Sequence, residues 1–284
     1  MKTFLILLVI LLAAFPAFAQ DPEATAEPLT LYSHPTERYH IVIPPGWRDF
    51  STPTYMLMEG GIMVRVFARS TRTPEVAVAL AESLSMFLPG SDIAPDATET
   101  LILPNGTWTR VLYPSLEGGA LTAYVQSYEG VHYVLMFMSA TGARPLVVPL
   151  EDARADGALA DAARAAVTLI ASDVTLNDTA GDSIEVLGQA YTPFTARDGT
   201  LTAWTRIVGS SGYVLVTMNG EAPDDAAFFT ILLDFFLTPE TTDYLALGVV
   251  AVVVVIGALL LSLIVRARNL RKDMATLREI ERTT

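Results

Sequence analysis

The sequence predicts an α+β fold, in which an antiparallel β-sheet is flanked by helices and is followed by a half-size C-terminal repeat and one transmembrane helix. Three observations support this class. Short stretches of alternating apolar and polar residues are separated by Gly-containing turns, which is typical of antiparallel strands. Between them, apolar residues recur at helical spacing. Finally, two hairpin-like stretches that lie 80 residues apart are nearly the same.

The N-terminus has the pattern of a secretory signal peptide, residues 1–19. Lys2 is followed by an apolar run and then by Ala17-Phe18-Ala19, a small-x-small cleavage site. An uncleaved anchor is the alternative, but the apolar run is short for crossing a bilayer. Residues 20–29, rich in Pro, Ala and acidic residues, are predicted to be a linker.

The C-terminus carries the membrane-span signal. Residues 245–265 form an uncharged apolar run of 21 residues, the length that a helix needs to cross the hydrocarbon core. Arg266, Arg268, Arg271 and Lys272 follow directly, and such a cluster marks the cytoplasmic side. We therefore expect a single-pass protein of the cell membrane with its N-terminus outside, a linker at 239–244 and a basic cytoplasmic tail at 266–284.

Charge and cysteine usage limit the possible functions of the exported region. Residues 20–243 contain 28 Asp and Glu and 11 Arg, a net charge of −17. An acidic surface of this size repels nucleic acid, so nucleic-acid binding is excluded. The acidity either serves solubility or attracts a cationic partner. The chain has no cysteine, which excludes disulfides, thiol nucleophiles and Cys-based metal sites.

The first exported domain is predicted to span residues 30–174. It opens with the strand-like "YHIVIP", stopped by "PPGW", and continues with "YMLME" and "MVRVFAR". Thr73 is the expected N-cap of a helix with Pro74 in its first turn, and Pro89-Gly90 ends that helix.

A second group of strands in this domain is expected to form a meander. Its strands are "TETLIL", "TWTRVLY", "LTAYVQS" and "HYVLMFM". Asn105-Gly106, Glu117-Gly118-Gly119 and Glu129-Gly130 supply the turns. An Ala-rich helix over residues 159–172 is expected to close the domain.

A half-repeat domain of hairpin and helix is predicted over residues 178–238. Residues 199–218 match residues 119–138 at eight of 20 positions, with Trp204 in the place of Tyr124. Each hairpin is followed by a helix-like segment, and the second of these, residues 225–236, is apolar almost all round. Such a helix is normally buried, although one this close to a span can also lie on the membrane. We expect the second copy to extend or cover the first sheet.

The stretch "YHIVIPPGW" is followed by strands, a helix, a meander and a closing helix. This order resembles the fold family shared by PsbP, the extrinsic protein of photosystem II, and a Ran-binding nuclear import factor. The resemblance covers about residues 29–174. It implies an antiparallel sheet with helices on both faces. It implies no catalytic residues, because the family shares none.

No catalytic, cofactor-binding or metal-binding residue is predicted. His34, His40 and His132 lie apart from one another and from paired carboxylates at ligand spacing. No Gly-x-Ser-x-Gly or phosphate-binding glycine motif occurs, and "GSSG" at residues 209–212 is better explained as a hairpin turn.

Four further features have a structural and a functional interpretation. Two acidic clusters lack the pattern of a calcium loop, and their place beside helix starts favours a helix-dipole role. The tryptophans are expected in the core rather than in a groove. The Asn-x-Thr pattern, an acceptor for N-glycosylation, occurs twice. The tail carries an apolar stripe that fits either contact with a partner helix or a simple extension of the membrane helix. The residues concerned are Glu151, Asp152 and Asp156; Glu221, Asp224 and Asp225; Trp47, Trp108 and Trp204; Asn105 and Asn177; and Leu270, Met274, Leu277 and Ile280.

The sequence thus favours a membrane-anchored extracytoplasmic module that binds or assembles with a partner and catalyses no reaction. A protein partner would contact the exported domain or the span and tail. Two alternatives stay open. One is an extracytoplasmic hydrolase-type enzyme whose site is assembled only by the fold. The other is a structural subunit of a membrane complex.

Overall fold

The computed structural model describes residues 30–34, 38–61, 64–115, 119–218, 223–237 and 242–283. The chain divides into two compact units, one ending at Phe236 and one beginning at Leu237. The predicted signal peptide at 1–19 and linker at 20–29 lie outside the described residues. Antiparallel sheets with helices packed on them confirm the α+β class.

A seven-stranded antiparallel sheet forms the larger part of the first unit, in the order β3-β4-β5-β9-β8-β7-β6. The predicted strands from "YMLME" to "HYVLMFM" all belong to it. Glu129 and Gly130, both at positive φ, make the two-residue turn between β8 and β9 as expected. The strands are β3 (Arg48–Asp49), β4 (Met56–Gly60), β5 (Val64–Thr71), β6 (Ala97–Leu103), β7 (Gly106–Leu112), β8 (Ala120–Tyr128) and β9 (Val131–Ser139).

Helix α2 (Val76–Phe87) covers part of one face of this sheet, against β5 and β9. It begins later than predicted, and Thr73 is not its N-cap. Glu75 holds that position with an extended backbone, while the Thr73 hydroxyl donates to the Glu75 carbonyl at 3.3 Å. Pro74 and Glu75 therefore stay outside the helix.

A second, five-stranded antiparallel sheet has the order β10-β14-β13-β12-β11. Residues 144–149 and the helix after them were predicted to belong to the first domain, but they lie in and on this second sheet. The second hairpin therefore does not extend the seven-stranded sheet. The elements are β10 (Arg144–Pro149), α3 (Ala158–Ile170), β11 (Ile184–Val186), β12 (Gln189–Thr195), β13 (Leu201–Val208) and β14 (Ser211–Met218).

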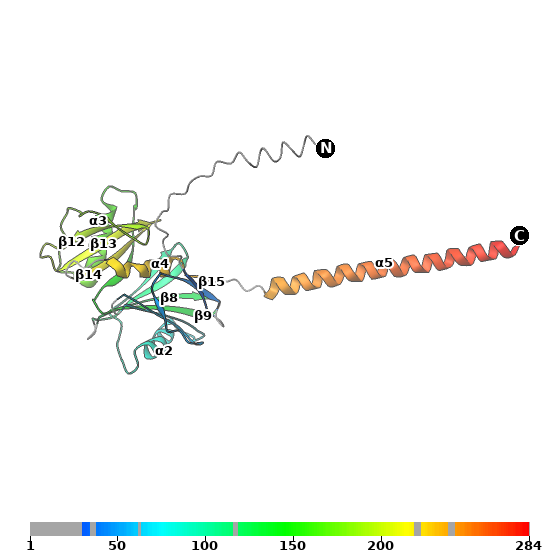
Figure 1. Ribbon diagram of the computed structural model, residues 1–284, viewed down its shortest axis with the longest axis horizontal. Helices are drawn as coiled ribbons and strands as arrows, with labels where there is room; N and C mark the ends of the chain where they lie inside the picture. The colour runs from blue at the N-terminus through cyan, green and yellow to red at the C-terminus, as the bar shows by residue number, and fades with distance from the viewer. Residues whose placement is uncertain are drawn as a thin grey trace, which may run out of the picture. The chain divides into compact units, whose positions relative to one another are not determined.

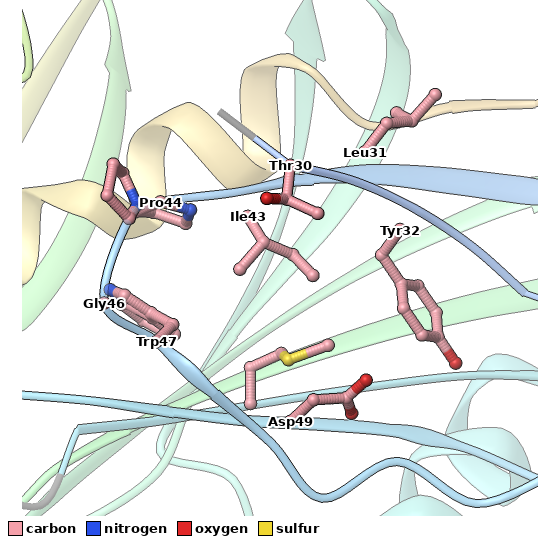
Figure 2. A pocket seen from close by; sticks show the side chains of 10 residues that line it. Thr30, Leu31, Tyr32, Ile43, Pro44, Gly46, Trp47 and Asp49 are labelled. Carbon is pink, nitrogen blue, oxygen red and sulfur yellow. The ribbon is translucent and has the colours of Figure 1, made fainter. Parts of the chain in front are cut away.

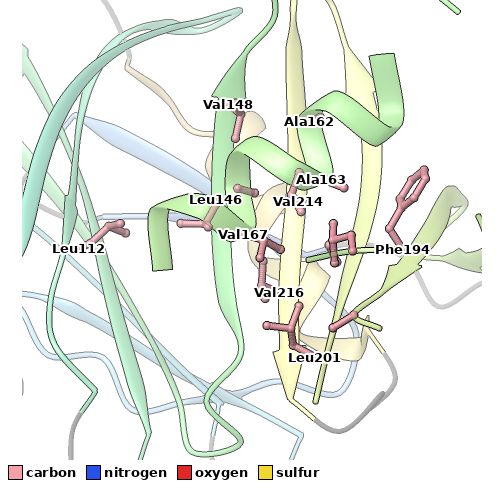
Figure 3. Close-up of a cluster of buried hydrophobic side chains, with 14 residues drawn as sticks. Leu112, Leu146, Val148, Ala162, Ala163, Val167, Phe194, Leu201, Val214 and Val216 are labelled. Atoms are coloured by element: carbon pink, nitrogen blue, oxygen red, sulfur yellow. The ribbon is translucent and has the colours of Figure 1, made fainter. Parts of the chain in front are cut away.

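Small residues let α3 lie directly on the second sheet (Figure 3). Ala162, Ala163 and Ala166 are buried against β13 and β14. At Gly212 a Cβ atom would stand 2.4 Å from the Ala162 Cβ, so only glycine permits this approach. The contact explains why the helix covers the second sheet.

The two blocks repeat one order of elements. Each block consists of a strand, a helix and four further strands, and its first strand pairs with its last. In the first block these elements are β5, α2 and β6 to β9, and in the second they are β10, α3 and β11 to β14. The hairpins also share a register, because Leu121 pairs with Met138 and Leu201 with Met218. The similarity of the second block therefore includes a strand and a helix before its meander, more than the predicted half-size unit.

A third sheet joins residues from both ends of the first unit, in the order β1-β2-β15. β2 is the predicted strand of "YHIVIP". The short helices η1 and α4 precede β15, so the predicted helix over 225–236 ends earlier than expected. The elements are β1 (Thr30–Ser33), β2 (Tyr39–Ile43), η1 (Pro223–Ala226), α4 (Ala227–Leu233) and β15 (Phe236–Leu237).

Helix α4 is buried between the two hairpins, as its nearly all-round apolar surface predicts (Figure 1). Phe228 contacts the rings of Tyr124 and Phe137 at 5.7 and 4.9 Å, and Phe229 contacts Tyr213 at 5.5 Å. The hairpin residues in these contacts face away from α2 and α3. Each hairpin is therefore buried on both faces, which explains its long apolar strands.

The second unit consists of helix α5 (Thr242–Thr283). Its segment Leu247–Lys272, with a mean hydropathy of 3.1, is long and apolar enough to cross a membrane. None of this segment is buried against the rest of the chain, which distinguishes it from the core helix of a soluble protein. The described part of α5 runs on through the predicted basic tail.

Candidate functional site

The loop Pro44-Pro45-Gly46-Trp47, which leads from β2 to β3, is the centre of the candidate site. Prolines end the pairing of β2, and Gly46 turns the chain at a φ of +77°. The Trp47 ring then lies against Gly60 of β4, where a Cβ atom would stand 2.2 Å from its Cε2. The missing side chain at Gly60 thus sets the position of the tryptophan.

A hollow of about 490 Å³ lies between this loop and strands β1 and β2. Tyr32 and Ile43 point from β1 and β2 toward the strand that carries Trp47 and Asp49, while Leu31 points away (Figure 2). The remaining lining residues are Thr30, Pro44, Pro45, Gly46 and Met58. Most of the lining residues are apolar or aromatic, although polar atoms contribute nearly half of the surface.

Asp49 supplies the negative charge of this hollow. Its Oδ1 accepts the Ser51 backbone N–H at 2.8 Å, and its Oδ2 makes no hydrogen bond to the described residues. Glu59 on the neighbouring strand is instead neutralised by Arg48 and by Arg65, whose Nε is 3.3 Å from Oε2. The hollow therefore combines an apolar wall with one carboxylate that has an available oxygen.

The phenol of Tyr32 is the titratable aromatic group in the wall of this hollow. Burial raises its pKa above the ordinary value, and the Asp49 charge acts in the same direction, against a hydrogen bond with Ser51 that lowers it. Tyr32 therefore stays neutral at physiological pH.

Trp47 also lines a smaller hollow of about 300 Å³ on the other side of the loop. The turn after β11 and the start of α4 supply its far wall through Val186, Leu187, Asp225 and Ala227. Trp47 thus separates two hollows. A third, of about 460 Å³, lies beside α2, with Leu80, Leu84 and Tyr113 among its lining residues.

The three histidines do not form one binding site. His34 and His132 are buried and His40 is half-buried. His40 and His132 each meet a serine through Nδ1, Ser33 at 2.8 Å and Ser127 at 2.7 Å. In both cases the two residues face each other in an antiparallel pair, so strand pairing accounts for the contact. Among the described residues, no group of three His, Asp or Glu side chains is placed to hold a metal ion.

The acidic clusters stabilise turns and loops. Asp152 accepts the Arg154 backbone N–H, and Asp225 accepts the Ser139 hydroxyl at 2.7 Å. The predicted helix-dipole role does not hold for the first cluster, because the one acidic residue in the first turn of α3 is Asp161. Glu221 lies outside the described residues.

The tryptophans divide between core and surface. Trp108 and Trp204 are buried, as predicted, whereas Trp47 is half-buried in the wall of the hollows. Sequence reasoning also missed Tyr32 and Asp49 as lining residues. The signal that could have found them is the "PPGW" motif itself, since loops that connect strands lie on the surface and often carry binding residues.

Asn105 has a structural role that its Asn-x-Thr pattern did not indicate. Its Nδ2 lies 2.7, 3.3 and 3.0 Å from the carbonyl oxygens of Leu232, Leu233 and Phe235, and its Oδ1 accepts the Trp108 indole N–H. Asn105 thus satisfies the C-terminal carbonyls of α4. A glycan on Nδ2 would remove these bonds.

Comparison with known proteins identifies a structural neighbour and no family. No protein-family model matches the chain, and neither does any curated protein sequence. A solved structure, the solution structure of cyanobacterial PsbP (CyanoP) from Synechocystis sp. PCC 6803, is similar over 44% of this chain and 87% of that one. The TM-score is 0.31 and the sequence identity 13%. The PsbP-like fold therefore stays a prediction from the "YHIVIPPGW" region.

Proposed function

We propose that the protein is a single-pass, membrane-anchored, extracytoplasmic binding module without catalytic activity. The hollow beside Trp47 takes an apolar side chain that neighbours a Lys or Arg of a partner polypeptide. The observation that carries this proposal is the combination of Tyr32 and Trp47 in the wall with the Asp49 carboxylate. The net charge of −17 on residues 20–243 adds a long-range attraction for a cationic partner.

The binding proposal is tested with the full chain in detergent micelles, labelled with 5-fluorotryptophan. The chain has three tryptophans, and Trp47→Phe identifies the fluorine signal of Trp47. A peptide of alternating Lys and Leu is expected to shift this signal to saturation, whereas a Glu and Leu peptide is not, because Asp49 repels it. An equal response to both peptides, or a response of Trp108 and Trp204 alone, would refute the proposal.

Two substitutions test the chemistry of the hollow. Asp49→Asn is expected to weaken binding of the Lys and Leu peptide about tenfold, the effect of losing one charge-assisted contact. Asp156→Asn removes the same charge outside the hollow and is the matched control. Gly60→Ala forces the Trp47 ring away and is expected to abolish the Trp47 response while the other two signals persist.

The orientation across the membrane is tested by labelling introduced cysteines, since the natural chain has none. Ala94 and Met274 are exposed positions in the two units. We expect a membrane-impermeant maleimide to label Ala94→Cys in intact cells and Met274→Cys only after permeabilisation. The opposite pattern would reverse the proposed topology.

A further inference from the structure

Three arginines are buried among the described residues, and two of them have hydrogen-bond partners. Arg110 donates to Glu99 and to the Val147 carbonyl. Arg144 donates to the Leu121 carbonyl at 3.2 Å and to the Ser115 hydroxyl. These contacts compensate the loss of hydration that burial imposes on a guanidinium group.

Arg206 on β13 is buried to a similar degree, at 8% exposure, and has no such partner. Its guanidinium lies between two tyrosine rings, 5.3 Å from the Tyr191 centroid and 5.8 Å from the Tyr213 centroid. Its Nε is closed off from solvent without a hydrogen bond. No acidic residue in the described ranges forms an ion pair with it. The aromatic clamp fixes the cation and leaves its hydrogen-bond donors unused.

The surroundings of Arg206 contain a second unused donor. The Tyr213 hydroxyl is buried and makes no hydrogen bond within the described structure. Burial raises its pKa to about 12, even though the charge of Arg206 acts the other way. Tyr213 is therefore a neutral O–H donor beside the guanidinium.

Asp234, directly after α4, is the acidic side chain that acts electrostatically on this cluster. Burial raises the pKa of its carboxyl group, and the Arg206 charge acts in the opposite direction. The two groups nevertheless form no ion pair. The Asp234 side chain is exposed.

Gln126 holds the position in the first hairpin that matches Arg206, and its role there is structural. Gln126 pairs with Tyr133 as Arg206 pairs with Tyr213. The Gln126 side chain donates to the Asn105 carbonyl at 3.0 Å, so a neutral amide satisfies this place in the fold. The second hairpin therefore carries a positive charge where the first carries a neutral amide.

We propose that Arg206, held between Tyr191 and Tyr213, binds a small oxyanion, a carboxylate or a phosphate. The planar guanidinium presents paired N–H donors that match two oxygens of such a group. The bound anion supplies the missing charge and hydrogen-bond acceptors. This site is separate from the hollow beside Trp47, so either proposal can fail without the other.

The test measures the thermal unfolding midpoint of the full chain in detergent micelles, with sodium acetate or sodium phosphate added at millimolar concentration. Sodium chloride keeps the ionic strength constant. We expect at least one of the two anions to raise the midpoint to a plateau. A rise with acetate alone assigns a carboxylate, and a rise with phosphate alone assigns a phosphate.

Three variants complete the test. Arg206→Gln, which installs the residue of the first hairpin, is expected to abolish the plateau. Arg164→Met, which removes a half-exposed arginine paired with Asp161 on α3, is expected to keep it. Asp234→Asn removes a competing negative charge and is expected to tighten anion binding roughly threefold.

The outcomes that overturn the proposal are equally defined. No rise with either anion, or the same rise in Arg206→Gln, excludes the site. If Asp234→Asn lowers the midpoint and abolishes the anion effect, Asp234 is the native partner of Arg206. If Arg206→Gln does not fold, the ¹⁵N chemical shift of the Arg206 Nε in the wild-type chain decides, because it moves only when an anion binds there.

Discussion

Phe228→Ala is expected to lower the free energy of unfolding by about 3–5 kcal/mol, the cost of removing a buried aromatic side chain. Phe228 is fully buried and contacts Tyr124 and Phe137, so its loss leaves a cavity between α4 and the first hairpin. Guanidinium unfolding of the full chain in mild detergent, followed by tryptophan fluorescence, measures the change.

The control for this prediction is Ile102→Ala. Ile102 is 79% exposed on edge strand β6. Its truncation is expected to cost less than about 1 kcal/mol. Similar losses for the two variants would contradict the burial of α4 between the hairpins.

Gly119→Ala is expected to destabilise the protein by more than about 3 kcal/mol, whereas Gly199→Ala, at the matching place of the second hairpin, costs about 1 kcal/mol. Gly119 has a φ of +138°, and a Cβ atom there would stand 2.0 Å from the Ser139 carbonyl oxygen. Gly199 has a φ of +74° and open space around it. Only the first variant combines backbone strain with a steric clash.

The same unfolding experiment compares the two glycine variants directly. They have the same chemistry and the same place in the repeated sequence, so each is the control for the other. Equal losses of stability would mean that the backbone at Gly119 can move away from Ser139 at little cost.

Local features of the fold could be predicted from the sequence. Alternation of apolar residues and two-residue turns gave the strands of both hairpins, because each strand pairs with its neighbour in the chain. The nearly all-round apolar surface of residues 225–236 predicted a buried helix, because a helical pattern can be read from neighbouring residues. These properties depend on residues that are close in sequence.

Assignment to the sheets could not be predicted, because it depends on distant pairing. Arg144 pairs with Val216, and α3 reaches the second sheet through Gly212. Asn105 satisfies carbonyls more than a hundred residues away, at the end of α4. No periodicity within a short window contains that information.

The candidate site was missed for a related reason. Tyr32 and Asp49 come from strands of different sheets and meet only when the "PPGW" loop folds between them. The motif predicts a fold resemblance, and its tryptophan alone is expected in the core. Likewise, a single arginine among apolar residues gave no indication that Arg206 would be clamped without an acidic partner.

The position of α4 fixes when the first unit can complete its folding. The residues of α4 fill the space between the two hairpins, and Phe235 stacks on Tyr39 of β2. These residues lie at the end of the first unit. During synthesis, these residues leave the ribosome after the strands that they contact. A chain cut after Phe236 retains the whole interior, whereas a nascent chain that stops before Pro223 exposes two aromatic sheet faces to any chaperone or protease nearby.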